Sequence, residues 1–279
     1  MTDEPPRKRS DAGFFLVLGG LSSCFLSLVV LMLLADFRFI SSSDFIETLS
    51  KPEIRSAFRV TLLTCTISAI LAVWTAAPLA YLLSRFRFWG RGLIEALVDT
   101  PMVLPPLVIG LSLLILFHQP LPAALSESGQ SLEQGIRSAF GFGVTYRWPA
   151  IVLAQFMVAA AFAIRTMRVT FDQIDPRAED IARVLGCTRL QAFLRVSLPQ
   201  ASRGLIAAIA IAWARSLGEF GPILVFAGAT RMRTEVLSTS VFLELSVGEL
   251  DAAVAVSLLM VAMAASVLLS LRLIGARLG

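Results

Sequence analysis

The chain has 279 residues, of which 56% are hydrophobic, and its mean hydropathy of +0.78 excludes an ordinary soluble domain. The net charge of +4 does not by itself indicate nucleic-acid binding, because the basic residues cluster in short loops between apolar segments. Three widely separated cysteines and one histidine suggest neither a disulfide framework nor a metal site. The composition therefore predicts an all-α integral membrane protein.

Residues 1–12 form a polar tail that contains Arg7, Lys8 and Arg9. The apolar run that follows is too long for the core of a secretory signal, and no cleavage site follows it promptly, so we expect an uncleaved first span. A topology of six spans places both termini in the cytoplasm. Basic residues are more frequent in the segments that this topology places in the cytoplasm than in those it places outside. The six expected spans cover residues 14–34, 60–83, 93–117, 149–167, 205–227 and 252–274.

The third expected span contains Asp99 and three prolines, Pro101, Pro105 and Pro106. Each proline removes a backbone donor and disfavours helix at the residue before it. Irregular backbone at membrane depth is tolerated only where it is buried in protein or lines a cavity. We therefore expect this span to face a translocation pathway, with a packing kink as the alternative.

The loop between the third and fourth spans, residues 118–148, is rich in Ser, Gly and Pro and becomes aromatic at its end. We interpret Tyr146 and Trp148 as members of an interfacial aromatic belt. His118, where the third span meets water, is expected to be interfacial, because no second metal ligand lies nearby.

The polar loop at residues 175–199 has the pattern of two short helices separated by a turn. Asp175 can cap the first helix, and Gly186 can end it. Thr188 and Gln191 have the spacing of a capping box for the second helix, which Pro199 is expected to close. The first helix has an apolar face formed by Ala178, Ile181, Ala182 and Leu185, and this face needs a partner surface.

The fifth expected span carries two charged residues, Arg215 and Glu219, which are costly near a bilayer centre unless they are paired or hydrated. Their i, i+4 spacing allows them to pair with each other, and Asp99 is a possible third member. Gly218 and Gly221 should loosen the helix beside them. Two interpretations stay open: a polar constriction that a permeating anion meets, and a structural ion pair inside the bundle.

The polar loop resembles the cytoplasmic EAA loop of ABC transporter permeases, whose pattern is matched in spacing by Asp180-Ile181-Ala182, Gly186, Val196 and Leu198-Pro199. Asp180 replaces a glutamate and Ile181 replaces an alanine. The resemblance implies that the loop docks on an ATPase subunit. The residues that it marks for this role are Asp180, Ile181, Ala182, Leu185, Gly186, Leu198 and Pro199.

Three further segments, 97–110, 212–228 and 248–258, resemble the molybdate, tungstate and sulfate branch of these permeases, most of all its molybdate and tungstate members. The resemblance covers the chain from about residue 55 to its end. It implies a permease domain at 13–279, with a core at about 55–275, in the six-helix type I importer (MetI-like) fold with cytoplasmic coupling helices. Pro222, where a small residue is expected, departs from the pattern and leaves the substrate identity open.

The resemblance also implies partners: a homodimer of permease subunits, two ATPase subunits and an extracytoplasmic oxyanion-binding protein, in the cytoplasmic (inner) membrane of a bacterium or archaeon. The chain has no phosphate-binding loop, so we expect it to hydrolyse no ATP and to bind no cofactor or metal itself, with ATP and Mg²⁺ used by the ATPase. The pathway residues expected are Asp99, Pro101, Pro105, Pro106, Arg215, Gly218, Glu219 and Gly221.

Other solutes stay possible, namely sulfate, thiosulfate, iron or a polyamine. An ion-coupled secondary transporter is the alternative from a different class, but it should show an internal repeat, and none is clear. Nucleic acid is not an expected partner.

Overall fold

The computed structural model describes residues 12–120 and 130–277, and in these ranges the chain forms helices and no β-strand. The predicted polar tail lies outside these residues apart from Ala12. In chain order the helices are α1 (Ala12–Phe39), α2 (Ser42–Ser50), α3 (Pro52–Arg85), α4 (Arg91–Val103), α5 (Pro106–His118), α6 (Leu132–Phe140), α7 (Trp148–Gln173), α8 (Arg177–Val184), α9 (Arg189–Ala192), a π-helix (Phe193–Ser197), α10 (Leu198–Gln200), α11 (Ser202–Leu217), α12 (Gly221–Phe226), α13 (Leu237–Val247) and α14 (Leu250–Arg277).

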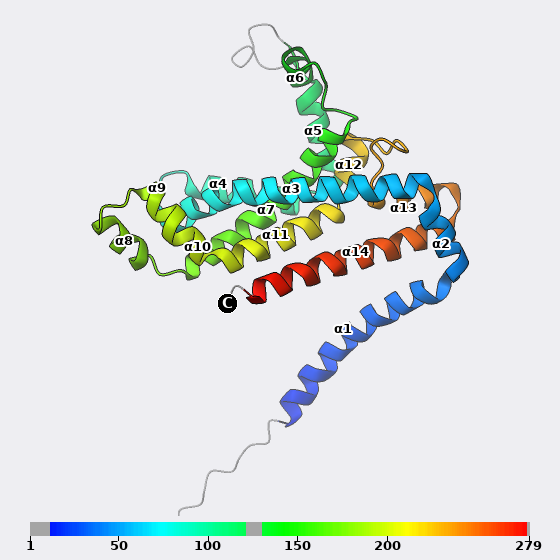
Figure 1. Cartoon of the computed structure of the whole chain (residues 1–279), viewed down its shortest axis with the longest axis horizontal. Coiled ribbons are helices and arrows are strands. Elements are labelled where there is room, and N and C mark those ends of the chain that lie inside the picture. Colours follow the sequence, from blue (N-terminus) through cyan, green and yellow to red (C-terminus); the bar gives the residue numbers. More distant parts are fainter. Residues whose placement is uncertain (1–11, 121–129, 278–279) are drawn as a thin grey trace, which may run out of the picture.

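The long helices α3, α7 and α11 pack side by side at the centre of the molecule, and α14 lies along α11 and α13 (Figure 1). Their buried faces consist largely of alanine, which lets helix backbones approach closely where a membrane provides no hydrophobic force between helices. The fully buried alanines of these faces include Ala72, Ala76 and Ala80 on α3, Ala154, Ala159 and Ala163 on α7, and Ala208 and Ala212 on α11.

One buried amide joins the three central helices. Gln155 on α7 is 1% exposed, and its Nε2 donates to the backbone carbonyl of Ser216 on α11 at 3.2 Å. Its Oε1 accepts from Ser68 Oγ on α3 at 3.1 Å. A buried amide that is satisfied in this way stabilises one arrangement of the helices, because any shift leaves a polar group unpaired.

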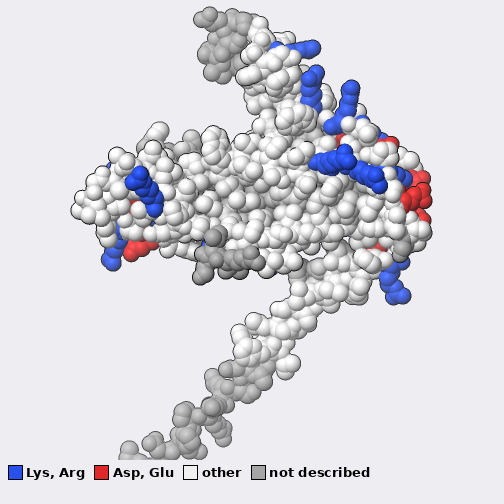
Figure 2. Space-filling view, in the orientation of Figure 1, with Lys and Arg blue, Asp and Glu red and all other residues white. Residues whose placement is uncertain are grey.

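The helices have the lengths and composition of membrane spans. Four of them, α1, α3, α7 and α14, are long and apolar enough to cross a bilayer. Two bent pairs, α4 with α5 and the segment Arg189–Gln200 with α11, bring the number to six if each pair is one span. On the face drawn in Figure 2, charged side chains gather at the two ends of the bundle and are almost absent between them. The apolar helix α1 projects away from the bundle (Figure 1).

The two proline- and glycine-containing spans are broken, as their sequences indicate. The third expected span consists of α4 and α5, which meet at an angle of 114° around Leu104 and Pro105, so the irregular backbone predicted at these prolines is confirmed. In the fifth, α11 ends at Leu217 and α12 begins at Gly221. The lack of a proline donor and the freedom of glycine explain why the helices stop there.

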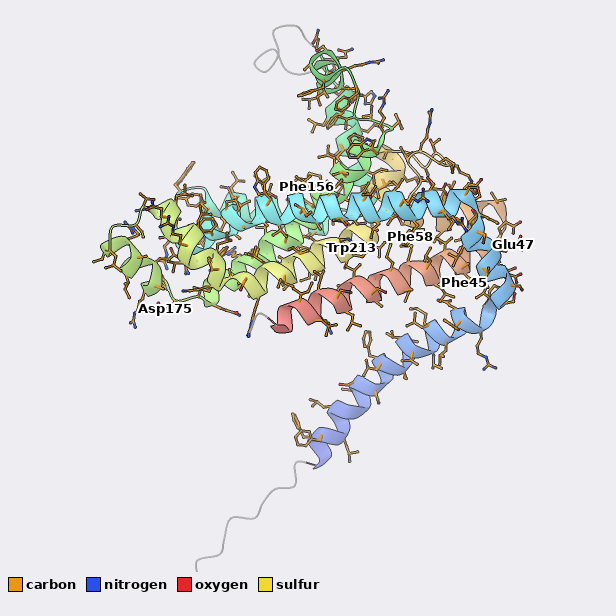
Figure 3. All side chains as sticks on the ribbon, in the orientation of Figure 1. Phe45, Glu47, Phe58, Phe156, Asp175 and Trp213 are labelled. Carbon is orange, nitrogen blue, oxygen red and sulfur yellow. The ribbon has the colours of Figure 1, made fainter. Side chains whose placement is uncertain are left out.

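Short helices also form where only loops were expected. Helix α6 begins with a reciprocal capping box between Ser131 and Gln134, so its segment is more ordered than its composition indicates. Helices α2 and α13 lie at one end of the bundle, here called the α13 end together with the loops 141–147 and 228–236. The opposite end, from α8 to α10, is the α8 end; Asp175 marks it in Figure 3, and Phe45 and Glu47 on α2 mark the other.

Candidate coupling site and substrate pathway

Local sequence sets the shape of α8. Asp175 Oδ1 accepts a hydrogen bond from the backbone N–H of Arg177 at 3.0 Å, and Gly186 has a φ of +95°. Thr188 and Gln191 cap α9 reciprocally. The predicted turn and capping box are therefore confirmed, whereas the N-cap of α8 is Pro176 and Asp175 lies one residue before it. Glycine is needed at residue 186 because other residues rarely adopt this backbone conformation.

The larger aliphatic side chains at α8 are largely exposed. Ile181 is 61% exposed, Leu185 is 80% exposed and the neighbouring Val184 is 87% exposed, while Ala182 is half-buried. Asp180 is exposed beside them. An exposed aliphatic patch of this kind indicates an interaction site.

Glu179 is the one buried residue of α8, at 8% exposure, and it fastens α8 to the end of α3. Its Oε2 accepts from Tyr81 Oη at 2.7 Å, and its Oε1 accepts from Arg85 Nε at 3.1 Å. Arg85 also donates to the carbonyl of Ile174 at 2.9 Å. Local sequence patterns could not indicate these contacts, because both partners of Glu179 lie more than ninety residues earlier in the chain.

The second helix of the loop does not end at Pro199. A π-helix at Phe193–Ser197 precedes it, closed by a hydrogen bond from the N–H of Leu198 to the carbonyl of Phe193, and Leu198 and Pro199 then continue as α10. Pro199 occupies the first turn of α10, where its missing N–H leaves no helical bond unmade. The bend to α11 comes at Ala201, and the prediction that Pro199 closes the helix is wrong.

The two broken spans meet each other. Gly221, at the start of α12, lies so close to α5 that an added Cβ would be 3.1 Å from Pro106 Cβ and 3.1 Å from the backbone N of Leu107. Gly110 on α5 approaches Pro222 more closely still, at 2.8 Å from an added Cβ to Pro222 Cα. The contact thus depends on the absence of a side chain at both glycines, and Gly110 is a site residue that the sequence did not indicate.

Arg215 and Glu219 form the predicted i, i+4 ion pair, with 2.6 Å between Arg215 Nη2 and Glu219 Oε1. The Glu219 side chain is 2% exposed and that of Arg215 is 40% exposed, with its guanidinium 5.0 Å from the centre of the Phe162 ring. The buried carboxylate therefore anchors a guanidinium that is partly accessible. Gly218, which lies between the two charged residues in the sequence, is the C-cap of α11.

Asp99 does not join this pair. Its carboxylate lies 3.4 Å from Arg165 Nη2 on α7, and both side chains are largely exposed. The expectation of a third member is wrong because the break after Val103 turns α4 along α7 instead of α11. Pro101 lies inside α4, one turn before the break, and Pro105 precedes α5 directly.

The chain matches the model of one protein family, described as the binding-protein-dependent transport system inner membrane component, over residues 68–279. The chain belongs to this family. The permease is 34% identical to a sulfate transport system permease protein of Salmonella typhimurium, over 96% of this chain and 94% of that one. It is 30% identical to a molybdate/tungstate transport system permease protein of Pyrococcus abyssi, over 76% of each chain.

Solved structures show the same fold. A chain of a bacterial alginate ABC transporter, in complex with an alginate-bound periplasmic protein, superposes on the permease with a TM-score of 0.72, 20% identity and coverage of 96% of this chain and 95% of that one. The permease is thus an all-α, multi-pass membrane protein with the fold of the type I ABC importers, and its relatives are permease subunits and not ATPases.

Proposed function

We propose that the permease forms the membrane pathway of an ATP-driven importer of a tetrahedral oxyanion, with molybdate or tungstate as the first candidate. The observation that carries the proposal is α8, a short helix with exposed aliphatic side chains that a single buried carboxylate fastens to α3. The names of the relatives, which are sulfate and molybdate/tungstate permeases, support the class of solute.

In this proposal two copies of the permease stand on two ATPase subunits, which bind ATP and Mg²⁺, and a binding protein delivers the solute from outside. The α8 end faces the cytoplasm together with both termini, and the α13 end faces outward. The excess of basic residues around α8 supports this orientation in a bacterial or archaeal cytoplasmic membrane.

Energy reaches the permease by contact at α8. Ile181 and Leu185 insert into a groove of the ATPase, and burying them contributes about 1.5–3 kcal/mol each before ordering costs. When the two ATPases close on ATP, α8 moves and pulls on α3 through Glu179, Tyr81 and Arg85. Asp180, Ala182, Gly186, Leu198 and Pro199 shape the loop that makes this contact.

The solute passes beside the contact of α5 with α12. Movement of α3, α7 and α11 separates or closes this contact. Pro105, Pro106 and Gly221 lie at the helix starts that form it, where the regular helix is interrupted. Arg215 offers its partly exposed guanidinium to the passing anion, while Glu219 holds it in place. Such switching requires that solute, binding protein and ATPase bind the two states unequally.

Sulfate is the second candidate. The relative from Salmonella typhimurium aligns along nearly the whole permease, including α1, whereas the molybdate/tungstate relative aligns over about three quarters of it. This difference in coverage favours the sulfate permeases, and the segment around Arg215 favours the molybdate and tungstate ones.

The test is uptake into liposomes that contain the permease with its ATPase and binding protein, with molybdate, tungstate and sulfate as competing solutes. Uptake that requires ATP and that tungstate blocks, while excess sulfate does not, establishes the first candidate. If sulfate blocks the uptake, sulfate becomes the assigned substrate. If no oxyanion enters while the permease still stimulates ATP hydrolysis, the oxyanion proposal is wrong and the coupling role of α8 stands.

A further inference from the structure

A cavity of about 640 Å³ lies at the α13 end, between the loop that precedes α7 and the loop that precedes α13. Its walls combine two arginines, Arg147 and Arg233, with the aromatic side chains Phe142, Tyr146 and Trp148. All three aromatic side chains are about half exposed. The cavity contains none of the residues assigned above to ATPase coupling or to the substrate pathway. The proposed transport cycle therefore gives it no role.

The backbone is strained at both walls of this cavity. Tyr146 has a φ of +56° and Met232 has a φ of +64°, and they are the non-glycine residues with positive φ in the described part of the chain. Each stands directly before one of the two arginines. Side chains of this size in the left-handed region are costly and persist where the surroundings hold them, often at binding sites.

The surroundings do hold the first of these loops. Glu133 on α6 accepts hydrogen bonds from the N–H groups of Val144 and Thr145 at 3.0–3.2 Å. The N–H of Tyr146 donates to the carbonyl of Phe226 at the end of α12, at 3.3 Å. The loop that carries Arg147 is therefore positioned by α6 on one side and α12 on the other.

The two arginines of the cavity differ from the neighbouring Arg231, which has carboxylate partners. Arg231, two residues before Arg233, lies 2.9 Å from Glu244 and 3.7 Å from Glu235, whose side chains are nearly buried. Among the side chains that the structure describes, no carboxylate lies within 4 Å of the guanidinium of Arg147 or Arg233, so neither forms a salt bridge. The cavity therefore presents two guanidinium groups that no carboxylate of the described residues neutralises, and an anionic partner can pair with them.

We propose that this cavity is the docking point for an acidic, apolar-bearing loop of the extracytoplasmic solute-binding protein. The inference rests on the proposed function, which supplies a binding protein on this side of the membrane. Arg147 and Arg233 pair with carboxylates of the loop, and Phe142, Tyr146 and Trp148 pack against its apolar side chains. Arginine with tyrosine and tryptophan is the composition of residues that dominate protein interfaces.

The shape of the cavity favours a protein loop over a free oxyanion. A five-atom tetrahedral anion fills a small part of 640 Å³ and offers nothing for three aromatic rings to pack against. A protein loop supplies both the carboxylates and the apolar groups. Charges that face a partner also accelerate encounter, so the contact should weaken as salt is added.

The experiment uses the full permease–ATPase complex in nanodiscs and, as the probe, the binding protein that supports uptake in the liposome test. The quantity measured is the concentration of binding protein that half-maximally stimulates ATP hydrolysis. The variants are R147Q, R233Q, the double variant and W148A, and the control is R137Q, which removes another exposed arginine, on α6, outside the cavity. Thermal unfolding of each variant checks that the fold is retained.

We expect the double variant to raise the half-maximal concentration by about tenfold or more, with basal ATP hydrolysis unchanged and R137Q close to wild type. The effect should shrink at high salt. An unchanged half-maximal concentration in the double variant would overturn the proposal. So would direct binding of tungstate or sulfate to the permease alone that the double variant abolishes while its response to the binding protein stays normal, because the cavity would then be a site for the free anion.

The liposome test keeps this inference separate from the proposed function. If wild-type complex imports an oxyanion and the double variant responds normally to the binding protein, only the docking site fails. If wild-type complex imports no oxyanion with any binding protein, the proposed function itself fails.

Discussion

The two ends of the permease bundle are fastened alike but expose different chemistry. At the α8 end, Glu179 is held by Tyr81 and Arg85, and at the α13 end, Glu244 is held by Arg231. Around the first pair the large exposed apolar residues are aliphatic, whereas the cavity near the second is lined by arginines and aromatic rings. The comparison teaches that a buried carboxylate paired with an arginine positions a surface at each end, while the exposed side chains beside it determine which partner that surface fits.

The largest effect is expected from Gly186→Pro, which breaks the turn of the α8 end. Proline fixes φ near −65°, and the native φ is +95°, so α8 and α9 cannot keep their arrangement. We expect uptake and stimulation of ATP hydrolysis to be abolished, with the protein still present in the membrane. Normal ATP-dependent uptake by this variant would show that the turn does not position the ATPase contact.

The next effect tests the fastening at each end. Glu179→Ala leaves Arg85 buried without its carboxylate, a change that costs about 3–5 kcal/mol for a buried pair. We expect uptake to fall by at least about tenfold because α8 no longer moves with α3. ATP hydrolysis by the assembled complex should continue but respond less to the binding protein.

Two matched variants sharpen this test. Tyr81→Phe removes one hydrogen bond to Glu179 and should have a smaller effect in the same direction. Glu244→Ala, at the α13 end, should instead weaken the response to the binding protein and leave the association of permease and ATPase intact. Equal effects of Glu179→Ala and Glu244→Ala on that association would break the comparison between the ends.

A moderate effect is expected from Gly110→Ala, in the contact that lies between the two ends. The added methyl group would lie 2.8 Å from Pro222 Cα, so α5 and α12 must move apart. Overpacking of this kind costs about 1–3 kcal/mol, and uptake should fall several-fold. Gly92→Ala on α4 is the control, because nothing lies within 4 Å of its added Cβ. If the two variants have the same thermal unfolding temperature and the same rate of uptake, the close contact of α5 and α12 is not required.

The smallest effect concerns Arg215 and Glu219. Each single substitution to alanine should reduce uptake, and Glu219→Ala should reduce it more, because the buried carboxylate positions the guanidinium. Exchange of the two residues should recover part of the loss. With expression matched, an exchange variant no better than the single variants would remove the support for a direct functional pair.

Part of the site was predictable because it follows from local rules. Asp175, Gly186, Thr188 and Gln191 act on neighbours within a few residues, and the breaks near Pro105 and Gly218 follow from missing donors and missing side chains. The error at Pro199 was also local: proline is compatible with the first turn of a helix, and a π-helix can precede it. The capping box of Ser131 and Gln134 also has a spacing that can be read directly from the sequence.

Hydropathy, proline and glycine positions and capping spacing determined by themselves that this chain is a helical membrane protein with an exposed, turn-linked helix pair at α8 and α9. Only the tertiary structure decided that Glu179 meets Arg85, that Asp99 meets Arg165 and not Arg215, and that Gly110 meets Pro222. The physical reason is the separation in sequence between the residues that interact. Backbone conformation and burial in a membrane depend on neighbouring residues, whereas a salt bridge or a glycine contact between distant segments depends on how whole helices bend and pack.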